Sequence, residues 1–352
     1  MEAVRRGEAP REFFLGALEL AERGHAVRQV EVDLNRAPGI GGGIVNLLLA
    51  QGWLPEKLDG SAVAEVARVL PELNRHDVIV GTTSGIGFAL ALFGRLGRLR
   101  PPVAVIHCGL LNNPYGRLRR RLTRSLLGNV HTVLYGEGEF APLHRLCPGI
   151  EEHMTVNPFG VDTDFWTPDP AVTREGFVLS VGNDGRRDFE TLARAARRLS
   201  CPVRILTART LPADLPANVT VTRGSWHEQN LSDAALRDLY RRAACVVVPL
   251  IESYQPSGQS VALQAMACGC AVVLTRTRGL WSERMMRDGV VAHLVPPGDA
   301  DALAETVGRV LGNRAAAEDL GRTAHETVCR EASCRVFADR METVLRGLAG
   351  RG

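Results

Sequence analysis

The feature that most constrains the fold is a regular alternation of short apolar segments with longer amphipathic segments along nearly the whole chain. Segments with the composition of buried strands are 25–32, 77–81, 103–107, 132–135, 177–181, 203–207, 219–223, 244–250 and 271–275. Helical patterns lie between them, for example at 14–23, 189–199 and 233–242. Because parallel strands need long crossover connections, this alternation predicts an α/β protein whose parallel sheets carry helices on both faces.

The chain has 352 residues, which is more than one hydrophobic core usually serves, and two domains are expected. The strand series breaks at Asn157-Pro158-Phe159-Gly160 and resumes after Pro170. We predict an N-terminal domain over 1–157, a linker over 158–170 and a second domain over 171–330. A C-terminal helix over 331–352 is expected to pack back on the first domain. Ligands would bind in a cleft at the carboxyl ends of both sets of strands.

The beginning of the chain fits this scheme less well. Residues 1–6 offer only Ala3 and Val4 as apolar residues, so either the first strand is very short or the recorded chain begins late. The glycine-rich run 39–43 lacks the spacing and the helix context of a dinucleotide-binding fingerprint. We predict that it is a flexible loop.

Composition favours a cytoplasmic protein without a bound metal or cofactor. No apolar run approaches the roughly 20 residues that span a bilayer, and residues 1–8 have no apolar core of a secretory signal. The eight cysteines are scattered, and Cys268 and Cys270 are too close together for a usual zinc site. Lys57 is the only lysine, so a bound phosphate would be met mainly by arginine.

A basic stretch follows the third apolar segment. Leucines at 118, 122, 126 and 127 give it the pattern of an amphipathic helix, and its arginines are Arg117, Arg119, Arg120, Arg121 and Arg124. One interpretation is a solvated helix face, and the other is peripheral contact with an anionic membrane at the inner face. Nucleic acid is disfavoured, because aromatic residues make up only 5% of the chain and none interleaves with these arginines.

The most informative segment runs from Val246 to Gly269. It reads as a buried strand, a polar loop, and a helix that Ser257 caps and Gly269 ends. Unpaired N–H groups and the positive dipole end at such a helix start suit a diphosphate, and Gln264, two turns along, would reach a ribose hydroxyl. The spacing of Ser257, Ser260, Val261 and Gln264 places them on one face. Any doubly wound fold contains similar units that bind nothing.

This segment resembles the signature of the retaining glycosyltransferases of family 4, which have the GT-B fold of two Rossmann-like domains. Further similar segments follow the family order, and together they cover roughly residues 155–311: 157–165, 180–184 with 186–188, 264–273, 288–289 and 294–299. The resemblance implies a metal-independent, hexosyltransferase-like enzyme of carbohydrate biosynthesis with a UDP- or GDP-sugar as co-substrate. Two departures matter, since Gln264 replaces the second glutamate of the signature and Pro256 stands where the first is expected. Glu252, in the same loop, is our candidate for the missing role.

The resemblance also implies roles for particular residues. Arg187, in preference to Arg186, would neutralise the donor diphosphate as the glycosidic bond breaks. His107 ends a strand and would contact the donor sugar or assist deprotonation of the acceptor. Thr82, Thr83 and Ser84 would border the acceptor. The full set expected to bind the donor is Gly182, Asn183, Arg186, Arg187, Ser257, Gly258, Gln259, Ser260, Val261 and Gln264.

The leading hypothesis is transfer of a sugar from a nucleoside diphosphate sugar to the hydroxyl or amine of an unidentified acceptor. Two alternatives stay open: a nucleotide-sugar epimerase on the same fold, and a protein that binds the nucleotide sugar without transferring it. A sugar phosphorylase would need a lysine for pyridoxal phosphate, and Lys57 lies in a loop of the other domain.

Overall fold

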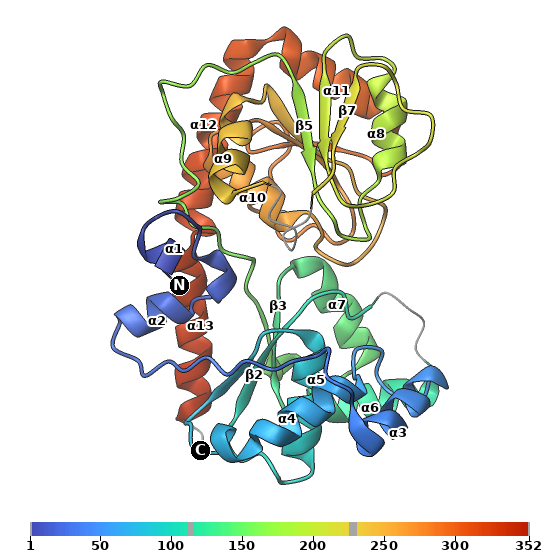
Figure 1. Ribbon diagram of the computed structural model, residues 1–352, viewed down its shortest axis with the longest axis vertical. Coiled ribbons are helices and arrows are strands. Elements are labelled where there is room, and N and C mark those ends of the chain that lie inside the picture. The colour runs from blue at the N-terminus through green and yellow to red at the C-terminus, as the bar shows by residue number, and fades with distance from the viewer. Residues whose placement is uncertain (1, 112–115, 225–230, 351–352) are drawn as a thin grey trace. The chain divides into compact units, whose positions relative to one another are not determined.

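The computed structural model describes residues 2–111, 116–224 and 231–350, which form two compact units (Figure 1). The N-terminal unit comprises residues 17–158, 254–256 and 338–350, and the C-terminal unit comprises residues 2–16, 159–253 and 257–337. The chain passes from one unit to the other after Pro158, at the start of the expected linker. Residues 2–16 differ from expectation, because they pack with the C-terminal unit and not with the domain that follows them in sequence.

The N-terminal unit contains a four-stranded parallel sheet whose strand order follows the chain. Its strands are β1 (Ile79–Gly81), β2 (Val103–His107), β3 (His131–Leu134) and β4 (Met154–Val156). Its helices are α2 (Ala17–Glu22), α3 (Gly39–Ala50), α4 (Gly60–Leu73), α5 (Ser84–Arg95), α6 (Arg117–Leu127), α7 (Glu137–Leu146) and the short 3-10 turn η2 (Glu151–His153). Phe88, Val105 and Leu134 are buried in its core. Residues 338–349 of α13 (Cys334–Ala349) also belong to this unit, where Glu342 binds Arg23 and His25.

The C-terminal unit contains a six-stranded parallel sheet in the order β10-β9-β8-β5-β6-β7. The strands are β5 (Val178–Val181), β6 (Val203–Leu206), β7 (Val219–Thr222), β8 (Cys245–Val248), β9 (Val272–Thr275) and β10 (His293–Val295). From β5 the chain runs outward to β7 and then returns to β8 on the other side of β5. The strand order therefore reverses between β5 and β8, which is where open α/β sheets bind ligands.

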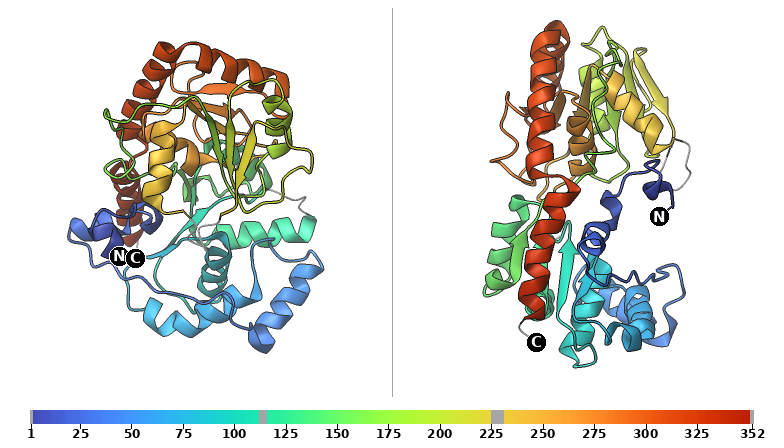
Figure 2. Two further views of the ribbon diagram at one scale, coloured as in Figure 1. Left: turned by 45° about the horizontal axis from the view of Figure 1, so that its top comes forward. Right: turned by 90° about the vertical axis from the view of Figure 1, so that its left-hand side faces the viewer.

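Helices cover both faces of the six-stranded sheet (Figure 2). On one face α8 (Phe189–Ala196) packs against α11 (Ala300–Gly312), and on the other α10 (Gln259–Ala267) packs against α9 (Asp233–Arg242) and α12 (Arg314–Glu331). The unit also holds the first helix, α1 (Glu2–Arg5), and the 3-10 turn η1 (Glu12–Phe14). Both faces of the strands are covered, which explains why β5, β8 and β9 are mostly apolar and buried along their whole length.

Two expectations for residues 25–43 are wrong. Residues 25–32 form no strand, because Val30 and Val32 pack against the core while their backbone pairs with no neighbouring strand. The run 39–43 is not a loop but the first part of α3. The packing of the two helices explains the glycine at 42, since a Cβ atom there would lie 2.5 Å from the carbonyl oxygen of Gly60 at the start of α4. Glycine thus permits the close crossing of α3 and α4.

Candidate functional site

The reversal between β5 and β8 brings two loops together at the carboxyl ends of these strands. Asp188 N donates to the carbonyl of Pro249, and Ile251 N donates to the carbonyl of Arg186, so the loop after β5 is fastened to the loop after β8. At the start of the first loop, Gly182 has φ +154° and would place a Cβ atom 1.9 Å from Nε of Arg187. Only glycine lets the Arg187 side chain lie across the end of β5.

Arg187 is the central residue of this site. Its side chain is almost completely buried, and its only ion pair among the described residues joins Nε to Oδ2 of Asp184 at 3.2 Å. Neither Nε nor one terminal nitrogen makes a hydrogen bond within the described structure. Burial lowers the pKa of Arg187, and the nearby Asp184 opposes this effect. A buried guanidinium whose donors find no acceptor among the described residues is costly unless a further acceptor binds it, so Arg187 is a candidate to bind an anionic ligand.

The N-terminus of α10 lies against this arginine. Gly258 is the N-cap residue in the left-handed conformation with φ +75°, and a Cβ atom on it would lie 2.7 Å from a terminal nitrogen of Arg187. Within the described part of the chain no side chain caps the helix. The expectation that Ser257 caps it is wrong, since Ser257 precedes the cap. Instead the Ser257 hydroxyl is buried and has no hydrogen-bond partner among the described residues.

Gln264 lies on α10 and is completely buried. Its amide nitrogen donates to Oε1 of Glu12 at 2.8 Å, and its amide oxygen accepts from the Tyr240 hydroxyl at 3.3 Å. Ser260 and Val261 share its face of the helix, whereas Ser257 lies outside the helix. Both ends of the Gln264 amide are thus occupied by protein, so a ribose hydroxyl would have to replace one of these partners.

Glu12 is a member of this cluster that sequence reasoning missed. It comes from η1, 252 residues before Gln264, and its carboxylate also accepts from Trp166 Nε1 at 2.8 Å and from Asp162 N at 2.8 Å. Burial raises the pKa of Glu12 to about 7, and the hydrogen bonds from Asp162, Gln264 and Trp166 oppose this rise. No local pattern in residues 1–16 announces the contact, because its partners are so distant in sequence.

The other expected donor-site residues have different surroundings. Asn183 binds protein through both ends of its amide, accepting from Ala208 N at 2.6 Å and donating to the carbonyl of Gly224. Arg186 is partly exposed, and its backbone rather than its side chain fastens the loops. Gln259 is buried at the start of α10. Glu252 is exposed, and its carboxylate accepts from both the backbone N and the Nε of Arg278.

The N-terminal unit collects its expected residues at the carboxyl edge of its own sheet. His107 ends β2, is fully buried, and lies with Nδ1 3.1 Å from the hydroxyl of Ser84 at the start of α5. Its Nε2 has no partner among the described residues. Burial lowers the pKa of His107 to about 3, so the imidazole is neutral at physiological pH. Thr83 caps α5 by accepting from Ile86 N, and Thr82 is exposed beside it.

A buried carboxylate supports this edge. Glu139, in the first turn of α7, accepts from Gly109 N at 3.2 Å and from Leu110 N at 2.9 Å. Burial raises the pKa of Glu139 to about 7, while these two hydrogen bonds and the charge of Lys57 act in the opposite direction. Glu139 thereby fixes the turn that follows His107. The sequence signal for it is weak, because acidic residues are common in first helical turns.

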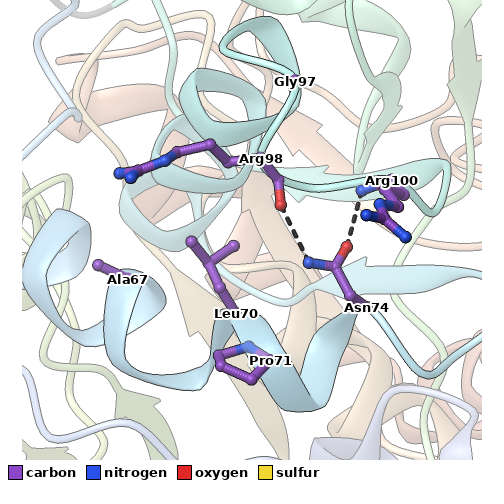
Figure 3. A pocket seen from close by; sticks show the side chains of 7 residues that line it. All are labelled: Ala67, Leu70, Pro71, Asn74, Gly97, Arg98 and Arg100. Atoms are coloured by element: carbon purple, nitrogen blue, oxygen red, sulfur yellow. Dashed lines mark hydrogen bonds between the residues drawn. The ribbon is translucent and has the colours of Figure 1, made fainter.

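A depression of about 430 Å³ lies elsewhere on the N-terminal unit (Figure 3). Asn74 bridges its wall, donating to the carbonyl of Arg98 and accepting from Arg100 N. The lining residues precede β1 and β2, so the depression lies at the amino ends of these strands. Ligands of parallel α/β sheets bind at the opposite edge, and this depression is therefore not the candidate site.

The described residues contain neither a membrane-spanning helix nor a cluster of metal-ligating side chains. No helix in the described part of the chain is long and apolar enough to cross a membrane. No group of three or more histidine, cysteine, aspartate or glutamate side chains among the described residues is placed to hold a metal ion.

Comparison with known sequences places the candidate site in a recognised domain. Residues 178–313 match the family model described as glycosyl transferases group 1. A D-inositol 3-phosphate glycosyltransferase from Kribbella flavida is 37% identical over 91 residues, which are 26% of this chain and 20% of that protein. The chain thus matches only about a fifth of the length of this curated relative. The matched family segment contains Arg187, Ser257 and Gln264.

Comparison with solved structures identifies the fold of the whole chain. A sucrose-phosphate synthase from Thermosynechococcus elongatus superposes with a TM-score of 0.67 at 22% identity, covering 83% of this chain and 78% of its own. A glycosyltransferase from Rickettsia africae gives 0.69 at 14% identity, covering 99% and 96%. Anabaena HepE in complex with UDP and glucose gives 0.68 at 14% identity, covering 94% and 89%. The two parallel sheets with their helices have the GT-B fold, as expected.

Proposed function

We propose that this chain, which has the GT-B fold and carries a glycosyl transferases group 1 domain, is a retaining glycosyltransferase of family 4. It would move a sugar from a nucleoside diphosphate sugar to a hydroxyl or amine of an acceptor. The donor diphosphate would bind in the C-terminal unit, between Arg187 and the N-terminus of α10. We also place the enzyme in the cytoplasm, with the arginines of α6 facing an anionic membrane.

One observation carries the donor assignment. The Arg187 guanidinium and the Ser257 hydroxyl are both buried with polar atoms that have no hydrogen-bond partner among the described residues, and both adjoin the start of α10, where the N-cap residue Gly258 has no side chain to cap the helix. A diphosphate would accept from all three kinds of donor at once. Its charge would also match the guanidinium and the positive end of the helix dipole. No acidic side chain other than Asp184 pairs with Arg187 among the described residues, so the site retains positive charge.

The relatives support the same ligand class. Solved structures of HepE contain UDP, UDP-glucose, or UDP with glucose, and the Kribbella protein is named as a glycosyltransferase. Family resemblance supports retention of the anomeric configuration. These comparisons favour a nucleoside diphosphate sugar over a dinucleotide or a free phosphate.

Each candidate residue has a physical task in this proposal. Arg187 would stabilise the negative charge that develops on the leaving diphosphate, and it would do so with little reorganisation because Asp184 already pairs with it and Gly182 leaves room for its side chain. His107 is neutral at physiological pH, so its Nε2, which has no partner among the described residues, can take part in a hydrogen bond at the acceptor side. A pKa of about 3 makes the imidazole too weak a base to hold a proton there. Ser84 holds the imidazole through Nδ1.

A binding protein without transfer activity is the second candidate, and one contact favours it. Glu252, which would replace the missing first glutamate of the signature, has its carboxylate engaged by Arg278. Pro256 supplies no charge in its stead. The two candidate functions differ in whether the protein breaks the glycosidic bond of the nucleotide sugar that it binds.

The first test is a thermal-shift screen of the full chain with UDP, GDP, dTDP, ADP and CMP. A ligand at 100 times its dissociation constant adds about 2.7 kcal/mol of stability and raises the melting temperature by several degrees. One nucleoside diphosphate should stabilise the wild type and the Arg186→Ala control, but not Arg187→Ala or Ser257→Ala. If the nucleotide stabilises both variants as much as the wild type, the assigned site is refuted.

The second test separates the two candidates. The nucleotide sugar selected by the screen is incubated with the protein, and release of the nucleoside diphosphate is followed with time. Slow hydrolysis or transfer that Arg187→Ala abolishes supports an enzyme. Tight binding without any release, also in the presence of a panel of acceptor alcohols and amines, supports the binding protein.

A further inference from the structure

Helix α3 turns an apolar face away from the rest of the N-terminal unit. Ile40, Ile44 and Leu47 are 89%, 54% and 62% exposed, and their spacing of four and three residues places them on one side of the helix. The opposite side packs on α4 through Gly42, and through Asn46, whose side chain accepts from Gly60 N at 2.7 Å. Folding of this chain thus leaves three large side chains in contact with water.

Two further exposed apolar side chains, those of Trp53 and Leu118, lie near the C-terminal end of α3. Trp53 follows α3 and is 51% exposed, and Leu118 on α6 is 50% exposed. Tryptophan with one apolar and one polar edge is suited to the boundary between hydrocarbon and water. We call Ile40, Ile44, Leu47, Trp53 and Leu118 the apolar patch.

The basic helix lies beside the apolar patch. Arg119 of α6 donates through Nε to the carbonyl of Gly52 at 3.2 Å, which fastens α6 to the residues that follow α3 (Figure 1). The other arginines of α6 are exposed: Arg117, Arg120, Arg121 and Arg124. No aspartate or glutamate occurs in residues 34–55 or in α6, so these segments contribute no negative charge to the surface.

We propose that the apolar patch and the α6 arginines form one surface that docks on a lipid bilayer containing anionic lipids. The arginines would bind headgroup phosphates, while Ile40, Ile44 and Leu47 enter the outermost hydrocarbon region. The inference shares the membrane location with the proposed function and adds α3 as the anchoring element. It does not depend on the nature of the sugar donor.

Charge and apolar area together select this partner. A nucleic acid would bind the arginines but leave the three apolar side chains of α3 in water. A second copy of the chain in a two-fold contact would cover the apolar patch but would bring two sets of α6 arginines near one interface. A bilayer with anionic headgroups satisfies both parts of the surface.

The test is vesicle co-sedimentation of the full chain without nucleotide. The vesicles consist of phosphatidylcholine, either alone or with about a third of the anionic lipid phosphatidylserine. The wild type should bind the anionic vesicles and lose most of this binding at high salt. The triple variant Ile40→Ser, Ile44→Ser, Leu47→Ser should bind at least roughly 100-fold more weakly, because three apolar side chains no longer leave water. The triple variant Arg117→Gln, Arg120→Gln, Arg121→Gln should also bind roughly 100-fold more weakly, at about 5-fold per charge.

Matched controls keep the test independent of folding and of donor binding. Leu96→Ser removes an apolar side chain that is 60% exposed in the same unit outside the surface, and it should bind vesicles like the wild type. Each variant should keep the melting temperature and the nucleotide response of the wild type. The fluorescence of Trp53 provides a readout in the wild type itself, because brominated lipids should quench it. The variant Trp53→Phe is the control and should show no such quenching.

Three results would overturn the inference. The first is that the wild type does not bind anionic vesicles, and the second is that the apolar triple variant binds them as tightly as the wild type does. Alternatively, the wild type alone forms a dimer in solution that the apolar triple variant abolishes, which would assign the patch to a second copy of this chain. Any of these leaves the nucleotide response, and with it the proposed donor site, unaffected.

Discussion

Replacing Glu12 by glutamine should change the pH dependence of stability of the C-terminal unit. Glu12 is buried among neutral donors, and its pKa rises from 4.5 to about 7. The folded state therefore holds this proton more tightly than the unfolded state. For an acid with a raised pKa, the stabilising contribution is complete below pH 4.5, is lost as the pH rises to about 7, and stays lost above it.

The magnitude follows from the two pKa values. At about 1.36 kcal/mol per pH unit, the whole interval corresponds to roughly 3 kcal/mol, of which about 2.5 kcal/mol falls between pH 5 and pH 8. Glutamine keeps the volume and cannot ionise, but its amide group faces the donating amide of Gln264 and costs about one hydrogen bond, or about 1 kcal/mol. Glu12→Gln should therefore equal the wild type near pH 5 and exceed it by about 2 kcal/mol at pH 8.

The assay is urea unfolding at both pH values, followed by the fluorescence of the buried Trp166 and Trp281, which both belong to the C-terminal unit. Glu8→Gln serves as the control, because Glu8 is largely exposed and its replacement should change neither midpoint. A difference between Glu12→Gln and the wild type that is the same at pH 5 and pH 8 would refute the reasoning.

Three further predictions concern the two sites. Arg187→Met keeps the side-chain volume and removes a buried charge, so the free energy of unfolding should stay level or rise by about 1–2 kcal/mol in denaturant melts, while nucleotide binding is lost. Gly182→Ala places a methyl group against Nε of Arg187 and should lower the free energy of unfolding by about 1–3 kcal/mol in the same melts; an unchanged midpoint would contradict the close approach. The ring protons of His107 should not shift in NMR spectra between pH 5 and pH 8, because its pKa is lowered to about 3. Because the folded state favours the neutral imidazole, the free energy of unfolding of the N-terminal unit should fall as the pH drops from 6.5 towards 3. A titration midpoint of the ring protons near neutral pH would show that the ring is not buried.

Much of the architecture was predictable because buried parallel strands are long apolar runs. Eight of the nine expected strand segments contain a strand, and α9 has the expected bounds 233–242. The strands β4 and β10 were missed, since each has only three residues and, unlike β1, includes a polar one, Thr155 and His293. The segment 25–32 was wrongly predicted as a strand. Its composition is that of a strand, but its valines pack against the core without a strand partner.

The donor site was predictable where it depends on local sequence, and not where it depends on distant contacts. Arg187 was favoured from its position after β5, and the structure adds that it is buried between Gly182 and Gly258. The cap of α10 was misassigned, because a serine before a helix is a common cap and the left-handed conformation of Gly258 is not visible in sequence. Glu12 was missed because only the folded chain brings residues 2–16 to α10.

The roles of the expected catalytic residues remain predictions that chemistry must test. Glu252 has the right charge in the right loop, but its partner Arg278 comes from the segment after β9 and could not be anticipated. His107 was placed correctly at the end of β2, whereas its full burial and its contact with Ser84 depend on the packing of α5.

The measurement that tests the central claim most directly is calorimetric titration of the preferred nucleoside diphosphate and of the corresponding nucleoside into wild type, Arg187→Met and Arg186→Met. The wild type and Arg186→Met should bind the diphosphate much more tightly than the nucleoside. Arg187→Met should lose roughly 10- to 150-fold in affinity for the diphosphate, as expected for a charged hydrogen bond, and nothing for the nucleoside. Equal affinity of Arg187→Met and wild type for the diphosphate would contradict the assignment of Arg187 and the start of α10 as the donor diphosphate site.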